Sequence, residues 1–469
     1  MQSATHSQEL SSASWGRFSI WSAAFLLLAS IPAVWLLMGG RTIMAAAYML
    51  VPAAVFFISS PRYSFYLFMA LNFVYAPYYL TGLAIHPWDI AALLFAAAAL
   101  VSWLLKYSPM VDKTSLDYNL LFLILATAFS AVFAYKPALS VIPTVRIILL
   151  FVIFRAIYYL SGKVSPSKIF RFFIHAYTLV SLYNCLIFFF HGGAMRIFGF
   201  SGIAFETFCM VGVPVSLAYA IWHPRSSGRA YYSIVFLINL MGAVATGSRG
   251  PLLTIAIAIP VLLLVSYLKA RRTGCNYARK YVRGFVMILI PVLLVIMAGS
   301  GYFLMVGERF EELGAEQPKG TILLRLSLWK AAIESFLLDP VSGIGVGNFR
   351  VIDDLLVHLK FDAVRYYLIG LSFHNVFLQY LAETGLPGAL AILLLGWNVL
   401  RIGRRVLRFN ETSEELPLAA ALFISAFIFF ITIFYMRAWT WGQEGYVLAL
   451  IMALLARVYR PIQMTAGQK

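Results

Sequence analysis

The chain has 469 residues, of which 62% are hydrophobic and only 12% charged, and its formal net charge is +17. This composition leaves too little polar surface to cover a soluble core, which excludes an ordinary globular protein and indicates a polytopic membrane protein. The basic residues lie in short clusters between apolar runs. Such clusters set membrane topology, so we exclude nucleic acid as a partner and expect membrane lipids around the chain.

Apolar runs of about 20 residues, the length that crosses a bilayer, recur along the chain. They predict an all-α protein with about 12–14 transmembrane helices. The runs lie at 17–38, 42–60, 63–82, 88–106, 117–135, 139–161, 168–190, 203–222, 230–247, 251–268, 282–304, 374–400, 416–436 and 442–459. The first run lacks a small-residue cleavage site, so we expect it to be a retained helix and not a signal peptide.

Lys and Arg in the short loops predict the orientation of the bundle. The two most basic loops, 269–283 and 401–408, are expected to be cytoplasmic. Counting spans outward from them places both termini in the cytoplasm and the interval 304–373 outside, together with the turns at 191–202, 246–250 and 437–443. The predicted domains are therefore a transmembrane bundle over 1–303, an extracytoplasmic cap over 304–373 and C-terminal transmembrane helices over 374–469.

The cap contains an expected amphipathic helix over 321–338. Its apolar residues recur at helical spacing, which suits a helix lying on the membrane surface. Arg325 lies one turn before Trp329 and should neighbour it. Asp339-Pro340 should end the helix. The apolar positions are Ile322, Leu326, Trp329, Ile333, Phe336 and Leu337.

Glycines after that helix, Gly343, Gly345 and Gly347, predict a structural turn, because no strand precedes them and no Lys follows, as a phosphate-binding loop would require. The segment Thr246-Gly247-Ser248-Arg249-Gly250-Pro251 is a second expected outer turn. Arg249 in this turn is a candidate for binding an anion, because we expect it to face outward beside a helix N-terminus. The alternative is a solvated arginine in a hairpin.

His374 is the main candidate for chemistry, because it stands where the cap ends and an apolar helix begins. A neutral imidazole can take a proton from a hydroxyl as a general base. Glu383 lies nine residues on, about 13 Å along a continuous helix, and Gly385-Leu386-Pro387-Gly388 should break that helix. Arg196, in another outer turn, is a weaker candidate. Arg146 lies inside a span and must face protein or water.

No metal site is visible in the sequence, and the three cysteines, Cys185, Cys209 and Cys275, are too scattered to predict a metal centre or a disulfide framework. We therefore expect no metal and no cofactor. This disfavours a metal-dependent sugar transferase.

Three segments together resemble the superfamily of O-antigen ligases and O-antigen polymerases, bacterial envelope glycan transferases. The resemblance covers roughly 200–400. The segments are the Ser248-Arg249-Gly250 turn, the run from Arg325 to Ala331 continuing to Pro340–Phe349, and the His374-Asn375 helix with Glu383, Gly385, Leu386, Pro387 and Gly388. Near 201–210, where such proteins often carry an Asn, this chain has Glu206 as a substitute polar contact.

The resemblance implies a metal-independent, inverting transferase in the bacterial inner membrane, with its active site facing the periplasm. Its donor would be a glycan linked to undecaprenyl pyrophosphate, and its acceptor a sugar hydroxyl on a glycan or lipid-linked molecule. Arg249 and Arg325 would hold the pyrophosphate and His374 would be the base. Asn375, Glu383, Arg196 and Glu206 would support them. A chain-length regulator protein is a further implied partner.

The compact cap favours a polysaccharide polymerase, of O-antigen or exopolysaccharide, over a ligase that attaches glycan to lipid A core. A secondary transporter, a lipid-linked glycan flippase and a structural assembly subunit are the alternatives from other classes. Transporters usually show repeated halves and broken helices at mid-depth, whereas the distinctive polar residues here gather on one side of the membrane.

Overall fold

The structure is a computed structural model of the chain. It describes residues 53–72, 78–80, 83–85, 87–104, 113–162, 164–190, 205–246, 248–299, 321–351, 373–412, 414–435 and 442–466. The predicted span 17–38 and part of 42–60 lie outside these residues.

Helices dominate the described chain, which confirms the predicted all-α membrane class. They are α3 (Pro61–Leu71), α4 (Pro87–Leu104), α5 (Ser115–Val132), α6 (Pro137–Leu160), α7 (Pro166–Phe190), α8 (Phe205–Trp222), α9 (Ser226–Ala245), α10 (Arg249–Arg272), α11 (Asn276–Gly299), α13 (Thr321–Leu338), the 3₁₀ helix η2 (Asn348–Val351), α16 (Val376–Phe409), α17 (Leu416–Thr432) and α18 (Gly442–Ala466). A short hairpin, β1 (Tyr78–Leu80) and β2 (Leu83–Ile85), interrupts them.

Seven described helices, α5 to α10 and α16, are long and apolar enough to cross a membrane. An eighth candidate is a bent pair, Ala53–Ser59 with Pro61–Leu71, whose axes meet at 113°. The helices α4 and α17 are apolar but shorter. The chain is thus a multi-pass membrane protein.

The predicted span 63–82 is not one helix. It ends as α3 at Leu71, and the chain then forms the β1–β2 hairpin, in which Leu80 pairs with Leu83. The two strands are antiparallel, with Tyr78 opposite Ile85 and Tyr79 opposite Ala84. Hydropathy alone did not reveal this, because the Tyr-Tyr-Leu and Leu-Ala-Ile strands are as apolar as a helix.

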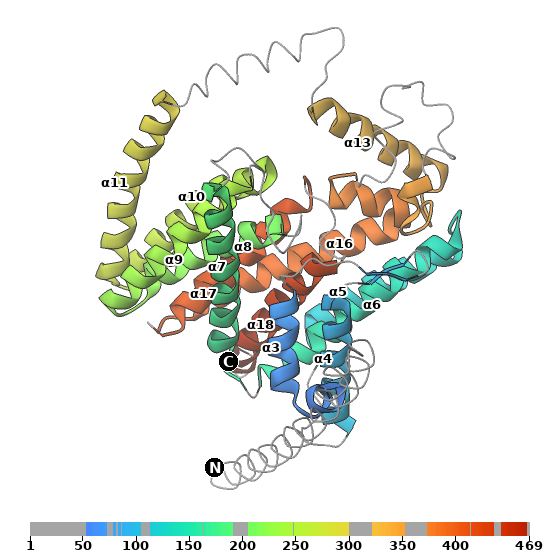
Figure 1. Ribbon diagram of the computed structural model, residues 1–469, viewed down its shortest axis with the longest axis horizontal. Helices are drawn as coiled ribbons and strands as arrows, with labels where there is room; N and C mark the ends of the chain where they lie inside the picture. The colour runs from blue at the N-terminus through green and yellow to red at the C-terminus, as the bar shows by residue number, and fades with distance from the viewer. Residues whose placement is uncertain are drawn as a thin grey trace, which may run out of the picture.

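Helix α8 is the centre of the bundle (Figure 1), packed against α7, α9, α10 and α17. Every residue of α8 except Glu206 is buried. A helix that is apolar on all sides belongs inside the protein. Glu206, in the first turn of α8, therefore marks the place where the buried core ends.

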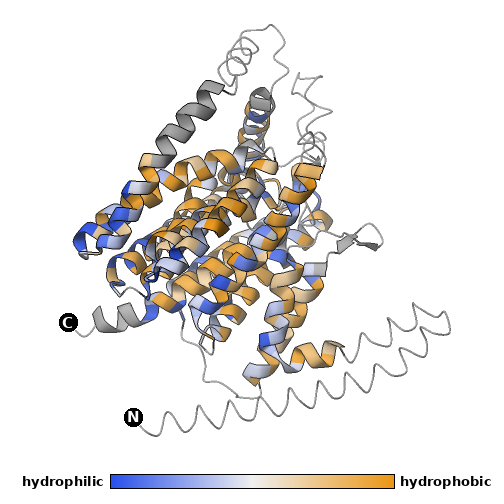
Figure 2. Ribbon diagram, turned by 60° about the vertical axis from the view of Figure 1, so that its left-hand side comes forward, coloured by the Kyte–Doolittle hydropathy of each residue, from blue (hydrophilic) through white to orange (hydrophobic). Residues whose placement is uncertain are grey.

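The loops of the bundle gather at two ends. At the first, which we call the His374 end, the amide of Tyr135 donates to the carbonyl oxygen of Ile344 at 3.1 Å, and the Asn375 side chain donates to the carbonyl oxygen of Phe434 at 2.7 Å. At the other, the Arg404 end, Lys269 Nζ donates to the carbonyl oxygen of Arg408 at 2.9 Å. Figure 2 shows hydrophobic colour along most of the bundle and hydrophilic colour gathered on helix ends at its lower left. This separation agrees with the predicted alternation of loops, and the compartment that each end faces stays a prediction.

Helix α16 is broken at Gly385, as the sequence predicted. Gly385 has φ 64° and ψ −164°, which is not helical, and Pro387 follows it. The break separates a short segment that begins at Val376 beside His374 from the longer segment that ends at Phe409. Figure 1 shows α13 against the first of these segments, at one end of the molecule.

Candidate active site

His374 is held in an unusual backbone conformation at the start of α16. Its φ is +50°, and among the described residues it is the lone non-glycine with positive φ. Such a conformation costs about 1–3 kcal/mol and persists only where the surrounding structure fixes it. Strained residues of this kind cluster at active sites, ligand clamps and switch regions. The side chain is half-buried.

Three hydrogen bonds fix the backbone on both sides of His374. Trp329 Nε1 donates to the carbonyl oxygen of Phe373 at 3.1 Å, and Asn375 Nδ2 donates to the carbonyl oxygen of Phe434 at 2.7 Å. The amide of Phe377 donates to the carbonyl oxygen of Ile433 at 3.0 Å. The site is therefore clamped between α13 and the end of α17.

Asn375 is the N-cap of α16. Its Oδ1 accepts from the amide of Leu378 at 3.0 Å, which satisfies one of the free donors of the first turn. The other end of the same side chain donates to Phe434, so one residue starts the helix and anchors it. Asn375 supports His374 through the backbone.

Arg325 lies on α13, one turn before Trp329, and is half-buried. Because Trp329 binds Phe373, Arg325 is brought to the same end of the bundle as His374. The bounds of α13 equal those predicted. It has two apolar sides: Leu326, Ile333 and Leu337 face outward, whereas Leu328, Ala331, Ala332 and Ser335 are buried. The sequence indicated the outward side and missed the small residues that pack on α16.

Arg249 is the first residue of α10, and the structure describes its backbone but not its side chain. Its neighbour Ser248 is the N-cap, yet no side-chain capping bond forms, because Ser248 Oγ donates to Glu206 Oε1 on α8. The first amides of α10 thus have no side-chain cap from Ser248, and the positive end of a helix favours anions. Glu206 thus contacts the residue before Arg249, and its role in the site stays a prediction.

A second contact ties the start of α10 to the surroundings of His374. Thr254 Oγ1 and Tyr435 Oη lie 2.8 Å apart, and Tyr435 follows the residues that bind Asn375 and Phe377. Arg249 is five residues before Thr254, about 7.5 Å along the helix. The structure therefore brings the backbone of Arg249 to the end that holds His374 and Arg325. Tyr435 and Thr254 belong to no motif, so the sequence did not indicate them.

Glu383 is buried and is hydrogen-bonded to other parts of the chain. It is 2% exposed, and its Oε1 accepts from the amide of Phe349 at 3.4 Å. Its carbonyl oxygen accepts from Ser130 Oγ at 2.6 Å and from the amide of Gly345 at 3.0 Å. Glu383 thus joins the broken helix to the glycine segment and to α5.

The glycine segment 343–347 docks on the break in α16. Gly343, Gly345 and Gly347 all have positive φ. A Cβ atom on Gly343 would lie 2.6 Å from the carbonyl oxygen of Glu383, so a larger residue does not fit. Hydrogen bonds from Ser342 hold the pKa of Asp339, just before this segment, below its usual range. These contacts agree with the predicted structural role of the glycines.

Gln379 is a buried amide that no motif in the sequence marks. It lies in the first segment of α16, is 1% exposed, and neither polar atom of its side chain has a hydrogen-bond partner in the described part of the chain. An unpaired buried amide is costly, which makes it notable five residues after His374. Its position four residues after Asn375 was the available signal.

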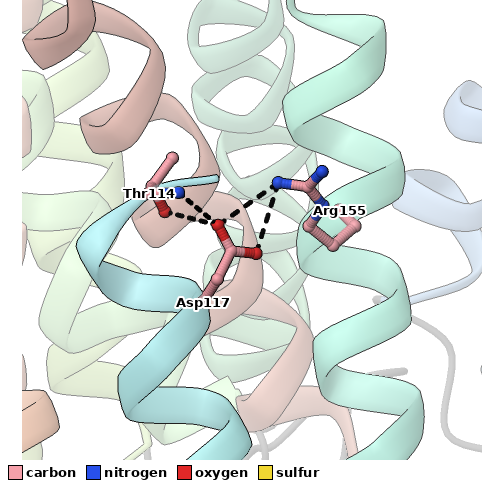
Figure 3. Close-up of polar contacts among 3 residues, drawn as sticks. All are labelled: Thr114, Asp117 and Arg155. Carbon is pink, nitrogen blue, oxygen red and sulfur yellow. Dashed lines mark hydrogen bonds and ion pairs between the residues drawn. The ribbon is translucent and has the colours of Figure 1, made fainter. Parts of the chain in front are cut away.

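Two half-buried arginines away from this site, Arg146 and Arg155, pair with carboxylates. Arg146 Nη2 lies 4.0 Å from Asp89 Oδ2 on α4, which gives Arg146 the partner that the sequence did not reveal. Arg155 Nη1 lies 3.2 Å from Asp117, whose carboxylate also accepts from the amide of Thr114 at 2.6 Å (Figure 3). Both pairs cross between neighbouring helices. Each arginine therefore has a carboxylate partner on a neighbouring helix.

The remaining predictions concern residues or ligands that the structure does not describe. Arg196 lies outside the described residues. Within the described ranges, no group of three or more His, Cys, Asp or Glu side chains is arranged to hold a metal ion. An imidazole beside water-accessible loops can act as a base, and arginines with an uncapped helix end can hold a diphosphate. Together these groups suit transfer of a group from a diphosphate to a hydroxyl.

No curated protein matches the chain. Residues 234–393, about a third of the 469 residues, match the sequence model of the family described as O-Antigen ligase. The matched segment contains the start of α10, α13 and the first segment of α16, which hold Arg249, Arg325 and His374. The match confirms the resemblance predicted from the sequence and supports, for this chain, the superfamily of O-antigen ligases and polymerases, glycan transferases of the bacterial envelope.

Proposed function

We propose that this protein polymerises a polysaccharide by moving a glycan from undecaprenyl pyrophosphate to a sugar hydroxyl of another carrier-linked glycan. The reaction takes place at the His374 end, on the periplasmic face of the inner membrane. The observation that carries the proposal is the fixed, left-handed backbone of His374 between α13 and α17. A base must be positioned, and the backbone of His374 is held in a strained conformation by tertiary hydrogen bonds of the residues on both sides of it.

His374 takes the proton of the acceptor hydroxyl as its oxygen attacks the anomeric carbon of the donor. The bond from that carbon to the pyrophosphate oxygen breaks, and undecaprenyl pyrophosphate leaves with the bonding electrons. Because the hydroxyl attacks from the face opposite the leaving group, the anomeric configuration inverts. No metal is needed for this step if cations meet the charge that develops on the leaving oxygen.

Arg249 and Arg325 hold the pyrophosphate. Guanidinium groups stay charged and offer planar pairs of donors that match phosphate oxygens. The uncapped amides at the start of α10 add to the attraction for an anion. Glu206 orients the Ser248-Arg249 turn through Ser248, and Asn375 and Glu383 position the start of α16.

A ligase that transfers the glycan to lipid A core is the second candidate, because the matched family carries that description. Both reactions use the same donor and differ in the acceptor. We favour the polymerase because the predicted cap, 304–373, is short. A chain-length regulator is a proposed partner of the polymerase.

The test is a reconstituted reaction with purified protein and a lipid-linked oligosaccharide, with and without lipid A core. A ladder of product lengths without added acceptor supports the polymerase. A single addition that requires lipid A core supports the ligase. A donor that stays unchanged in both reactions contradicts transfer and favours a transporter or flippase.

A further inference from the structure

A large cavity opens at the Arg404 end, away from the candidate active site. Its volume is about 1240 Å³, and it lies between the last turns of α10 and α16 and the side of α17. From the break at Gly385 to Arg401 is sixteen residues, about 24 Å along α16. The cavity is lined by Val265, Leu268, Lys269, Arg272, Thr273, Trp397, Leu400, Arg401, Arg404, Arg405, Leu407, Arg408, Phe409, Glu411 and Phe423.

The lining is strongly basic, with six cationic side chains and one carboxylate. That carboxylate, Glu411, lies 3.9 Å from Lys269. Among the described residues, no carboxylate lies within 4.0 Å of the five arginines. Arg401 and Arg405 donate to neutral oxygens, of Asn398 and Tyr459. The cavity therefore holds a surplus of positive charge that the described chain does not neutralise.

The arginines of α16 form a stripe. Arg401, Arg404 and Arg408 recur at spacings of three and four, so they share one side of the helix, and all are exposed. Trp397, one turn before Arg401 on the same side, is 53% exposed. Trp prefers the level of the lipid headgroups, and arginine binds phosphate with paired donors. Along α16, Trp397 therefore lies nearer the middle of the bundle, and the three arginines lie nearer its end.

The opposite wall repeats this order. On α10, Val265 and Leu268 precede Lys269 and Arg272 along the helix toward the same end. Leu268 is 46% exposed. The cationic side chains therefore lie nearer the helix ends, together with Leu407 and Phe409, and the lining farther from those ends is apolar. A membrane phospholipid has the same arrangement of acyl chains and phosphate.

We propose that this cavity binds the headgroup of an anionic phospholipid from the leaflet at the Arg404 end. The arginines of α16 contact the phosphodiester, and Trp397 and Leu268 line the first part of the acyl chains. Basic pockets between transmembrane helices bind acidic headgroups in this way. The volume exceeds the roughly 300–1,000 Å³ of an ordinary small-molecule site, which suits a headgroup with part of its chains better than an inorganic anion.

The test compares lipid stabilisation in matched variants of the full chain. The wild type, the double variant Arg401→Gln/Arg404→Gln and the control Arg279→Gln/Lys280→Gln are purified in the same neutral detergent. The control removes the same charge from the same end but outside the cavity. Thermal unfolding midpoints are measured with added phosphatidylglycerol, phosphatidylcholine or sodium pyrophosphate, and retained lipid is measured by native mass spectrometry.

We expect phosphatidylglycerol, and not phosphatidylcholine, to raise the midpoint of the wild type and the control by several degrees. The cavity variant should lose most of this shift and its retained acidic lipid. Equal shifts in all three proteins would overturn the proposal, because the attraction would then be general to the surface. A shift with pyrophosphate as large as with lipid would also overturn it, since the site would then take a soluble anion. None of these readouts depends on transferase activity.

Discussion

At the scale of single residues, the effect of the His374 backbone conformation on stability can be measured separately from the chemistry of its imidazole. A left-handed conformation costs an alanine about 1–2 kcal/mol and costs glycine almost nothing. We therefore expect His374→Gly to unfold at a higher temperature than His374→Ala in the same detergent, although neither has an imidazole. Equal midpoints would contradict the positive φ of this residue.

The buried amide of Gln379 gives a second prediction at this scale. Because its polar atoms have no described partner, replacing it with an apolar residue of similar length should not weaken the fold. We expect Gln379→Met to keep or raise the thermal unfolding midpoint in the same detergent. A clear fall of the midpoint would show that the amide has a partner that stabilises the fold.

At the scale of elements, the glycine segment is the contact that holds the break of α16. Gly343 and Gly274 have the same φ, +67°, but a Cβ atom on Gly274 would meet nothing within 4 Å. Alanine at either position carries the backbone cost, whereas only Gly343→Ala adds overpacking of about 1–3 kcal/mol. We expect Gly343→Ala to lower the thermal unfolding midpoint by several degrees more than Gly274→Ala does.

The same pair of variants should differ in limited proteolysis. Gly343→Ala should expose the segment after α13 to cleavage, because its contacts with Glu383 and Gly385 are then lost. Gly274→Ala should be cleaved as slowly as the wild type in this segment. Identical cleavage of both variants would mean that the glycine segment is not docked on α16.

The elements also show what the sequence could predict. The bounds of α13, the break of α16 and the structural turn of the glycines were predicted, because each depends on local periodicity or on Gly and Pro. The partners of these elements were not predicted. Ser130 and Glu383 are separated by 253 positions, and no local pattern indicates that the hydroxyl of one meets the carbonyl of the other.

For the candidate site the division is similar. His374, Arg325 and the Ser248-Arg249 turn were recognisable as polar groups beside apolar runs, and the fold brings their backbones to one end. The pair of Thr254 and Tyr435 was not recognisable, since a hydroxyl in a span usually binds its own helix. Residue types indicated the chemistry, and only tertiary contacts could show how the elements are joined.

At the scale of the whole molecule, the separation of the two ends predicts which residues each compartment can reach. Lys136, at the start of α6, is exposed at the His374 end, and Cys275 lies in the turn between α10 and α11 at the other end. In spheroplasts, a membrane-impermeant maleimide should label Lys136→Cys in a Cys275→Ser background. The native Cys275 should react only after the inner membrane is permeabilised. The reverse pattern would overturn the proposed orientation.

The proposed reaction gives an imidazole and an arginine separate roles at one end of this bundle. The most direct measurement compares donor binding and product formation for the wild type, His374→Ala and Arg249→Ala with a lipid-linked oligosaccharide. We predict that His374→Ala binds the donor but forms no product, and that Arg249→Ala is impaired in both. Full turnover by His374→Ala would contradict the assignment of His374 as the base.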